Sequence, residues 1–280
     1  MNPVGAGSWT HPGSCERCDA SVLNHWLSVL VALTLPITAA GQLRDRTVRV
    51  GAEVVRIRCD GPRRGSAPVV VLEAGAGNGA DSWNRVFPAL AEFSRVCAYD
   101  RPRFDEVGHD LRLGAPTDIV ARLRRLLAAA GERPPYILVG HSSGGLVARL
   151  YARTFHNQVA ALVLVDPTPE RWPQSPETSP LREDREVSLL AREVASRPCD
   201  IECPVIVLSR GHWSAPPGVD DDELVERVGR WTQVQRKLAR CSAQGQHQIA
   251  RDSGHNIQLT EPHLIVEAVR RVAEQAAQRR

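Results

Sequence analysis

Short apolar runs alternate with longer segments of helical periodicity along most of this chain. Residues 46–50 and 53–59 alternate apolar and polar side chains, which predicts an antiparallel strand pair joined near Gly51. Further strands are predicted at 69–72, 96–99, 137–139, 161–165, 205–208 and 246–251. Helices are predicted at 82–93, 118–130, 146–154, 223–239 and 262–278. This alternation is typical of an α/β fold whose mostly parallel sheet carries helices on both faces.

The alternation breaks after Asp166, where five prolines fall between residues 167 and 180 and a charged helical stretch follows at 181–195. We interpret residues 167–200 as a lid or cap insertion because of where the segment leaves the predicted sheet. A surface loop carrying one helix is the plainer alternative.

The first 41 residues differ from the rest and are predicted to form a tail outside the main domain, 42–280. An apolar run at 26–35 is followed by small residues at 38–40, which resembles a secretory signal and is too short to span a bilayer comfortably. The region before the run is long and acidic for a signal, and a start at Val22 or Leu23 gives an ordinary length. We therefore expect export. If the segment does not function, a disordered tail and a cytoplasmic protein are expected.

Length limits the number of domains, and charge limits the kinds of molecule that the protein is expected to bind. With 280 residues, 42% of them hydrophobic, the chain can bury a large core as one domain or two small ones. Its formal charge of +3 is small and the basic residues are scattered, so neither nucleic acid nor an anionic membrane is expected as a partner. The sequence does not indicate an oligomeric state.

The segment 136–145 carries the strongest chemical signal. The apolar run 137–139 leads into a Gly-x-Ser-x-Gly pentapeptide with Ser142 at its centre, and a helical stretch follows at once. At such a strand–turn–helix bend the serine hydroxyl is lifted clear of the sheet, and glycines flank it because a Cβ there would collide with neighbouring elements. Ser142 is the candidate nucleophile, against the alternative of an ordinary Gly/Ser turn.

A serine hydroxyl needs a base within hydrogen-bond reach, and the base needs an acid to fix its tautomer. Of nine histidines, His255 is the best placed, because it follows the last predicted strand and precedes the last helix. A parallel sheet brings that position to the same edge as Ser142. The alternative is a capping or surface histidine.

These motifs together resemble the α/β-hydrolase fold superfamily over about residues 46–277, in matching order. The segments that carry the resemblance are Glu73-Ala74-Gly75-Ala76-Gly77, Tyr99-Asp100-Arg101, Gly140-His141-Ser142-Ser143-Gly144-Gly145 and Ser253-Gly254-His255-Asn256. The resemblance implies a mostly parallel eight-stranded sheet and a Ser-His-acid triad. It also implies an oxyanion hole formed by the backbone N–H groups of Ala76 and Ser143.

The resemblance leaves the acid open. Most relatives carry it shortly after the seventh strand, where this chain has 209–213 without a carboxylate and the next acid is Asp220. A subset of the family, including lipases of the pancreatic type, carries it after the sixth strand, where Asp166 lies. We choose Asp166 over Asp220; the alternatives are a turn cap for Asp166 and the acidic start of a helix for Asp220. Relatives usually carry a Gly-x-Gly turn after the Asp-Arg pair. Here Pro102-Arg103-Phe104-Asp105 follows Arg101 instead, which changes a loop near the predicted pocket mouth.

The implied activity is hydrolysis of a small-molecule ester through an acyl-serine intermediate, with no metal or organic cofactor. Amidase, lactonase and perhydrolase activities use the same parts, and a ligand-binding homologue without turnover is the alternative of a different class. Dehalogenases and epoxide hydrolases are disfavoured because both need an aspartate in place of Ser142.

The seven cysteines bear on the compartment, because export permits disulfides. Cys15 and Cys18 form a lone Cys-x-x-Cys, which is half of a zinc-site pattern with no second half nearby, and no function is expected of it. The implied fold places the strands of Cys59 and Cys97 side by side, so this pair is the first candidate disulfide. Cys241 with Cys199 or Cys203 is the second, and buried thiols are the alternative.

Overall fold

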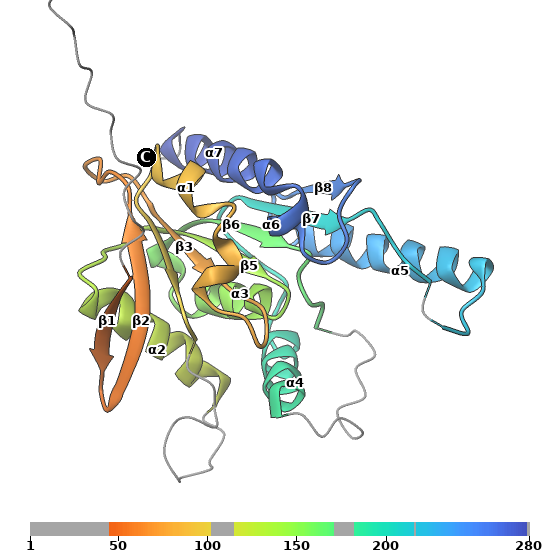
Figure 1. Cartoon of the computed structure of the whole chain (residues 1–280), viewed down its shortest axis with the longest axis horizontal. Helices are drawn as coiled ribbons and strands as arrows, with labels where there is room; N and C mark the ends of the chain where they lie inside the picture. The colour runs from red at the N-terminus through yellow and green to blue at the C-terminus, as the bar shows by residue number, and fades with distance from the viewer. Residues whose placement is uncertain (1–44, 102–114, 171–181, 216, 279–280) are drawn as a thin grey trace, which may run out of the picture. The chain divides into compact units, whose positions relative to one another are not determined.

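One mixed sheet organises the computed structural model, which describes residues 45–101, 115–170, 182–215 and 217–278 (Figure 1). All of them fall within one compact unit, Gln42–Arg280. The strands are β1 (Asp45–Val50), β2 (Glu53–Asp60), β3 (Val69–Glu73), β4 (Val96–Tyr99), β5 (Tyr136–His141), β6 (Val159–Val165), β7 (Val205–Arg210) and β8 (Gln246–Ala250). Their spatial order is β1-β2-β4-β3-β5-β6-β7-β8. Only the pairs β1/β2 and β2/β4 are antiparallel, so the predicted eight-stranded, mostly parallel sheet is confirmed.

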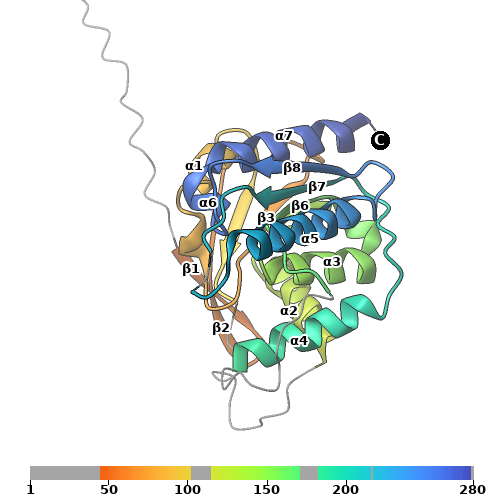
Figure 2. The same cartoon turned by 90° about the vertical axis from the view of Figure 1, so that its right-hand side faces the viewer.

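Helices cover both faces of this sheet (Figures 1 and 2). They are α1 (Phe87–Ala91), α2 (Pro116–Ala129), α3 (Gly144–Thr154), α4 (Arg182–Ala195), α5 (Asp221–Ala239), α6 (Ile257–Thr260) and α7 (Pro262–Gln278), with the 3-10 turns η1 (Ala80–Trp83) and η2 (His156–Gln158). The apolar faces of α2, α3, α4 and α5 share one core cluster, and those of α1, α6 and α7 share another. Every residue of β3, β4 and β5 is buried, because each of these strands has helices on both sides.

The topology positions the site. Strands β3, β5, β6, β7 and β8 run parallel, so their carboxyl ends meet at one edge of the sheet. The register is explicit there, since Val139 of β5 lies between Leu72 of β3 and Val163 of β6. Ligands bind outside this edge in open α/β sheets, which is where the loops with the candidate residues begin.

The helix predicted over 82–93 is wrong, because the segment divides into η1 and the short helix α1. Pro88 lies in the first turn of α1. Proline lacks an N–H and its ring clashes with the carbonyl of the fourth residue before it, so a continuous helix through Pro88 is disfavoured. Hydrophobic periodicity does not detect this interruption.

The segment interpreted as a lid contains α4, which packs against α2 and α3. Val187, Leu190 and Val194 of α4 are buried in the core cluster shared with those helices. Residues 171–181, which lead into α4, lie outside the described residues, so the closing function of 167–200 stays a prediction.

Both expected disulfides are present in the described residues. Cys59 and Cys97 lie opposite each other in the register of β2 and β4 and are bonded. Cys199 is bonded to Cys241, which resolves the alternative left open between Cys199 and Cys203.

Several expectations concern segments outside the described residues: the tail 1–41 with its signal-like run, the start at Val22 or Leu23, the Cys15/Cys18 pair and the loop 102–105. They stay predictions. Among the helices that are described, none has both the length and the apolar character that a membrane crossing requires.

Candidate active site

Ser142 stands at a sharp bend between β5 and α3. Its φ of 52° is in the left-handed region, which is costly for a residue with a side chain. A Cβ on Gly140 would lie 2.5 Å from the carbonyl oxygen of Gly144, and one on Gly144 would lie 2.4 Å from that of Glu73. Both glycines are therefore required by the close approach of β3, β5 and α3, as the motif predicted. The bend is held by a bond from the Ser142 N–H to the Val165 carbonyl, 3.1 Å long.

Asp166 follows β6 in a second strained conformation, with φ at 41°. Within the described residues, Ser142 and Asp166 are the only non-glycine residues with positive φ. Such outliers cost about 1–3 kcal/mol each and cluster at functional sites. Ser142 and Asp166, the candidate nucleophile and acid, therefore share a positive φ. The sequence pattern did not predict this conformation for Asp166.

The Asp166 carboxylate is fully buried and has four partners. Its Oδ1 accepts hydrogen bonds from the Arg210 backbone N–H at 3.0 Å and from Trp231 Nε1 at 3.1 Å. Its Oδ2 accepts a hydrogen bond of 2.6 Å from His255 Nδ1 and forms an ion pair with Arg210 Nε, which lies 2.7 Å away without hydrogen-bond geometry. A buried carboxylate is costly unless its charge and lone pairs are satisfied, and these contacts satisfy both.

The contact with Asp166 fixes the tautomer of His255. An ionised carboxylate only accepts hydrogen bonds, so Nδ1 carries the proton and Nε2 keeps its lone pair in the neutral ring. His255 lies in the loop between β8 and α6, and its side chain is 38% exposed. Asp166 thus orients the imidazole through Nδ1, while part of the ring stays accessible to solvent.

His141, the second residue of the Ser142 pentapeptide, positions the His255 loop. Its Nε2 lies 2.9 Å from the His255 carbonyl oxygen, and the two ring centroids are 4.7 Å apart. Gln258 Nε2 lies 3.4 Å from His141 Nδ1, so the ring donates through Nε2 and accepts through Nδ1. Burial, with a smaller contribution from the charge of His255, lowers the pKa of His141 to about 4. His141 is a neutral structural ring at pH 7.

The structure joins Asp166 to His255, but it does not join His255 to Ser142 by a hydrogen bond. In the described part of the chain the recorded partner of Ser142 Oγ is Thr168 Oγ1, at 3.5 Å. His141 nevertheless ties Ser142 and His255 to one edge of the sheet, because it precedes Ser142 and contacts His255 directly. Catalytic hydrogen bonds are often long or poorly aligned before substrate binds.

The expected oxyanion donors lie beside the nucleophile. A Cβ on Gly75 would lie 3.1 Å from Ser142 Cβ, so the loop after β3 packs directly against the serine. Neither the Ala76 N–H nor the Ser143 N–H has an acceptor among the described residues. Backbone N–H groups without an acceptor are rare in folded proteins and are typical of sites that bind a negatively charged oxygen.

Asp220 is not part of this cluster. Its side chain accepts a hydrogen bond of 2.8 Å from the Glu223 N–H and caps the N-terminus of α5. That is the structural role weighed for it in the sequence.

Comparison with known proteins agrees with this architecture. A family profile described as "alpha/beta hydrolase fold" matches residues 67–195. The structure is similar to a thermophilic esterase from Thermogutta terrifontis, with a TM-score of 0.60 and 18% identity over 83% of this chain and 99% of that chain. The chain has the α/β-hydrolase fold.

Other similar proteins extend over most of this α/β-hydrolase. Carboxylesterase CesB of Bacillus subtilis superposes with a TM-score of 0.58 and 14% identity, covering 81% of this chain and 90% of that chain. In sequence, the YqjL protein of Bacillus subtilis (strain 168) is 27% identical over 217 residues, which are 72% of this chain and 83% of YqjL. At these identities the solved structures establish the fold.

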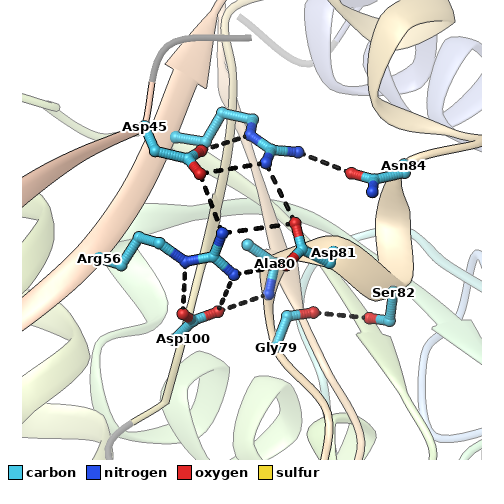
Figure 3. A network of polar contacts seen from close by, with 9 residues as sticks. Asp45, Arg56, Gly79, Ala80, Asp81, Ser82, Asn84 and Asp100 are labelled. Carbon is cyan, nitrogen blue, oxygen red and sulfur yellow. Dashed lines mark hydrogen bonds and ion pairs between the residues drawn. The ribbon is translucent and has the colours of Figure 1, made fainter.

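An ion-pair network anchors the far end of the loop between β3 and η1, residues 74–79 (Figure 3). Asp100, directly after β4, accepts a hydrogen bond of 2.8 Å from the Ala80 N–H. Arg56 of β2 binds the same carboxylate through Nε and Nη2, at 2.6 and 3.1 Å. Arg56 also binds Asp45 and Asp81, and its hydrogen bond lowers the pKa of Asp81. The antiparallel edge of the sheet thus fixes where the loop turns into η1.

A buried cluster anchors the near end of the same loop. The Glu73 carboxylate, at the end of β3, accepts hydrogen bonds from Tyr99 and Arg101. Burial raises the pKa of Glu73, and the charge of Arg101 opposes that shift. Arg101 also donates to the Ala74 carbonyl at 3.1 Å and lies 3.4 Å from Glu186 of α4. The loop is therefore held at both ends by residues that follow β4.

In the described ranges, one group of potential metal-ligand atoms lies close together and belongs to Cys59, Cys97 and Glu132. Both cysteines are in the disulfide, so their sulfurs are not available as thiolates. This group is not a metal site.

Sequence reasoning missed four residues of the site. His141 was named only as part of the pentapeptide, and Arg210 only as part of a segment without a carboxylate. Thr168 and Trp231 carried no signal, because their contacts depend on how the insertion and α5 fold back on the sheet edge.

Proposed function

We propose that this α/β-hydrolase cleaves carboxylic esters through an acyl-serine intermediate on Ser142. The observation that carries the proposal is the hydrogen bond between buried Asp166 and His255 Nδ1, which leaves Nε2 as a base on the sheet edge where Ser142 is held at positive φ. The esterase and carboxylesterase of similar fold support the reaction class.

The proposed reaction assigns each group one task. His255 Nε2 takes the Ser142 proton while Oγ attacks the ester carbonyl, and the resulting oxyanion accepts hydrogen bonds from the Ala76 and Ser143 N–H groups. The imidazolium then gives its proton to the leaving alcohol. A water molecule attacks the acyl-serine in the same way, which releases the acid and restores the hydroxyl. Loss of one oxyanion donor costs about 2.7–4 kcal/mol in comparable sites.

The first proton transfer requires Ser142 Oγ to come within reach of His255 Nε2 and to leave Thr168. A hydrogen bond as long as 3.5 Å is weak and is readily exchanged. Thr168 is the second residue of the segment interpreted as a lid, so the hydroxyl contact that Ser142 must leave belongs to that segment.

A fluorophosphonate probe tests the proposal, because it reacts only with an activated serine. Labelling mapped to Ser142 and abolished in Ser142→Ala is the expected result. No labelling of the folded wild-type protein would instead favour a ligand-binding homologue without turnover. Turnover of a panel of esters of graded acyl length, and of matched amides and lactones, then distinguishes esterase, amidase and lactonase activity. Addition of peroxide as a competing acyl acceptor tests for perhydrolase activity.

We also propose that the protein is exported. The Cys59–Cys97 and Cys199–Cys241 disulfides support this proposal, because disulfides persist mainly in oxidising compartments. N-terminal sequencing of the protein recovered outside the cytoplasm tests it. A terminus near the small residues at 38–40 is expected, and an intact Met1 on the exported protein would contradict signal cleavage.

A further inference from the structure

Arg210, the last residue of β7, is enclosed by two tryptophans. Its guanidinium carbon lies 4.7 Å from the centroid of the Trp213 ring and 4.6 Å from that of the Trp231 ring. The two rings are 5.9 Å apart at 75° to each other. The Arg210 side chain is 22% exposed. A guanidinium held on two aromatic rings has few alternative positions, since leaving either ring forfeits a cation–π contact.

The guanidinium of Arg210 forms an ion pair with Asp166, the candidate acid. Arg210 Nε lies 2.7 Å from Asp166 Oδ2, while the backbone N–H of the same residue donates to Oδ1 at 3.0 Å. Trp231 contacts both partners, because its ring stacks on Arg210 and its Nε1 donates to Oδ1 at 3.1 Å. Arg210 Nη2 also lies 3.3 Å from His255 Nδ1, but both atoms carry hydrogen when Nδ1 donates to Asp166, so this approach is not a hydrogen bond. One residue therefore contacts both oxygens of the carboxylate that orients the His255 ring.

Charge balance explains why such a residue is needed. Asp166 is fully buried, and a buried carboxylate without a counter-charge is costly. A triad histidine cannot supply that charge permanently, because it must be neutral when it accepts the serine proton. Arginine stays protonated throughout, so Asp166 keeps its counter-charge in every protonation state of the imidazole.

Arg210 lies on the strand next to the one that leads into Asp166. It ends β7, the strand after which the family resemblance places the acid of most relatives, whereas the candidate acid of this chain, Asp166, follows β6. The cation and the carboxylate thus leave neighbouring parallel strands at the same edge, and their side chains meet there.

We propose that Arg210, held by Trp213 and Trp231, is a positioning residue that balances the charge of the Asp166 carboxylate and keeps this carboxylate aimed at His255 Nδ1. This inference rests on the proposed function for its catalytic consequence. The geometric part, that Arg210 maintains the Asp166–His255 hydrogen bond, holds or fails independently of turnover.

Proton NMR of the full chain tests the geometric part without any substrate. The proton in the short His255 Nδ1–Asp166 hydrogen bond is expected to resonate far downfield, and its loss in His255→Gln assigns it. Arg210→Met should abolish or shift the resonance, and Arg210→Lys should retain part of it because the charge remains. The matched control is Arg270→Met. It removes an arginine of α7 whose guanidinium carbon lies 3.8 Å from the centroid of the Phe93 ring. This control should leave the resonance in place.

Ester turnover tests the catalytic part. Arg210→Met should lower kcat by about 100-fold, less than the roughly 10⁴-fold that removal of a triad acid costs, with little change in KM. Arg210→Lys should recover most of that loss. An unchanged resonance and unchanged kcat in folded Arg210→Met would overturn the proposal. If Arg210→Met does not fold, Trp213→Leu, which removes one ring and keeps the charge, should shift the resonance; no shift there would also overturn it.

The two failures are distinguishable. A wild-type protein that shows the resonance but neither labels nor turns over would refute the hydrolase and leave the role of Arg210 to the NMR comparison. A wild-type protein that turns over while Arg210→Met retains resonance and rate would refute only the role of Arg210.

Discussion

Asp166 Oδ2 and His255 Nδ1 are joined by a hydrogen bond of 2.6 Å across 89 residues of sequence. The two residues come from the ends of strands that are not adjacent, because β7 lies between β6 and β8. The loop after β8 must therefore cross the end of β7 to bring His255 to Asp166. It is held there by the His212 N–H, which donates to the Ser253 carbonyl at 2.9 Å.

Asp166→Asn should lower ester turnover by about 10⁴-fold, because an amide in this place no longer fixes the tautomer that leaves Nε2 free. Steady-state kinetics on the preferred ester measures the effect. Asp220→Asn is the matched control, since asparagine caps a helix as well as aspartate does, and both activity and stability should stay close to wild type. The reverse pattern would reassign the acid to Asp220.

The sequence predicted the parts of the site that depend on local pattern and chain order. The bend at Ser142 requires its glycines wherever it occurs, and the position of His255 follows from strand order in a parallel sheet. The choice of Asp166 over Asp220 was harder, because both residues also fit capping roles. Arg210 and Trp231 were missed because their role comes from tertiary contacts alone. Likewise, only the structure reveals that Thr168 lies beside the Ser142 hydroxyl.

Removal of the Cys59–Cys97 disulfide should destabilise the fold. The bond closes a segment with a sequence separation of 38 and joins β2 to the sheet. Loop-closure entropy for that length gives a loss of about 4 kcal/mol in the free energy of unfolding, with a usual range of about 2–4 kcal/mol. Urea unfolding of the Cys59→Ala/Cys97→Ala double variant measures it. Equal stability of the variant and the wild type would mean that the bond does not form in the protein.

Gly144→Ala should destabilise the protein by about 3 kcal/mol or more, because the new Cβ would lie 2.4 Å from a backbone oxygen of Glu73 that cannot move aside cheaply. Gly229→Ala is the matched control. Gly229 lies within α5, and a Cβ added there would have nothing within 4 Å, so alanine should stabilise by roughly 0.5–1 kcal/mol. Thermal or urea unfolding compares the two, and equal effects of both substitutions would contradict the close packing of the end of β3 against α3.

His141 should make the stability of this protein fall in mildly acidic solution. In the folded chain its pKa is lowered to about 4, whereas an unfolded histidine takes up a proton below about 6.5. The unfolded state therefore binds one more proton between these values, so the free energy of unfolding decreases as the pH falls from 6.5 to 4. The full effect is about 3 kcal/mol, from about 1.4 kcal/mol for each unit of pKa difference. Urea unfolding at a series of pH values should show this decrease in the wild type and a shallower one in His141→Gln, whose amide does not titrate. The same dependence of the free energy of unfolding on pH in both proteins would mean that the buried His141 ring is not held neutral in the folded state.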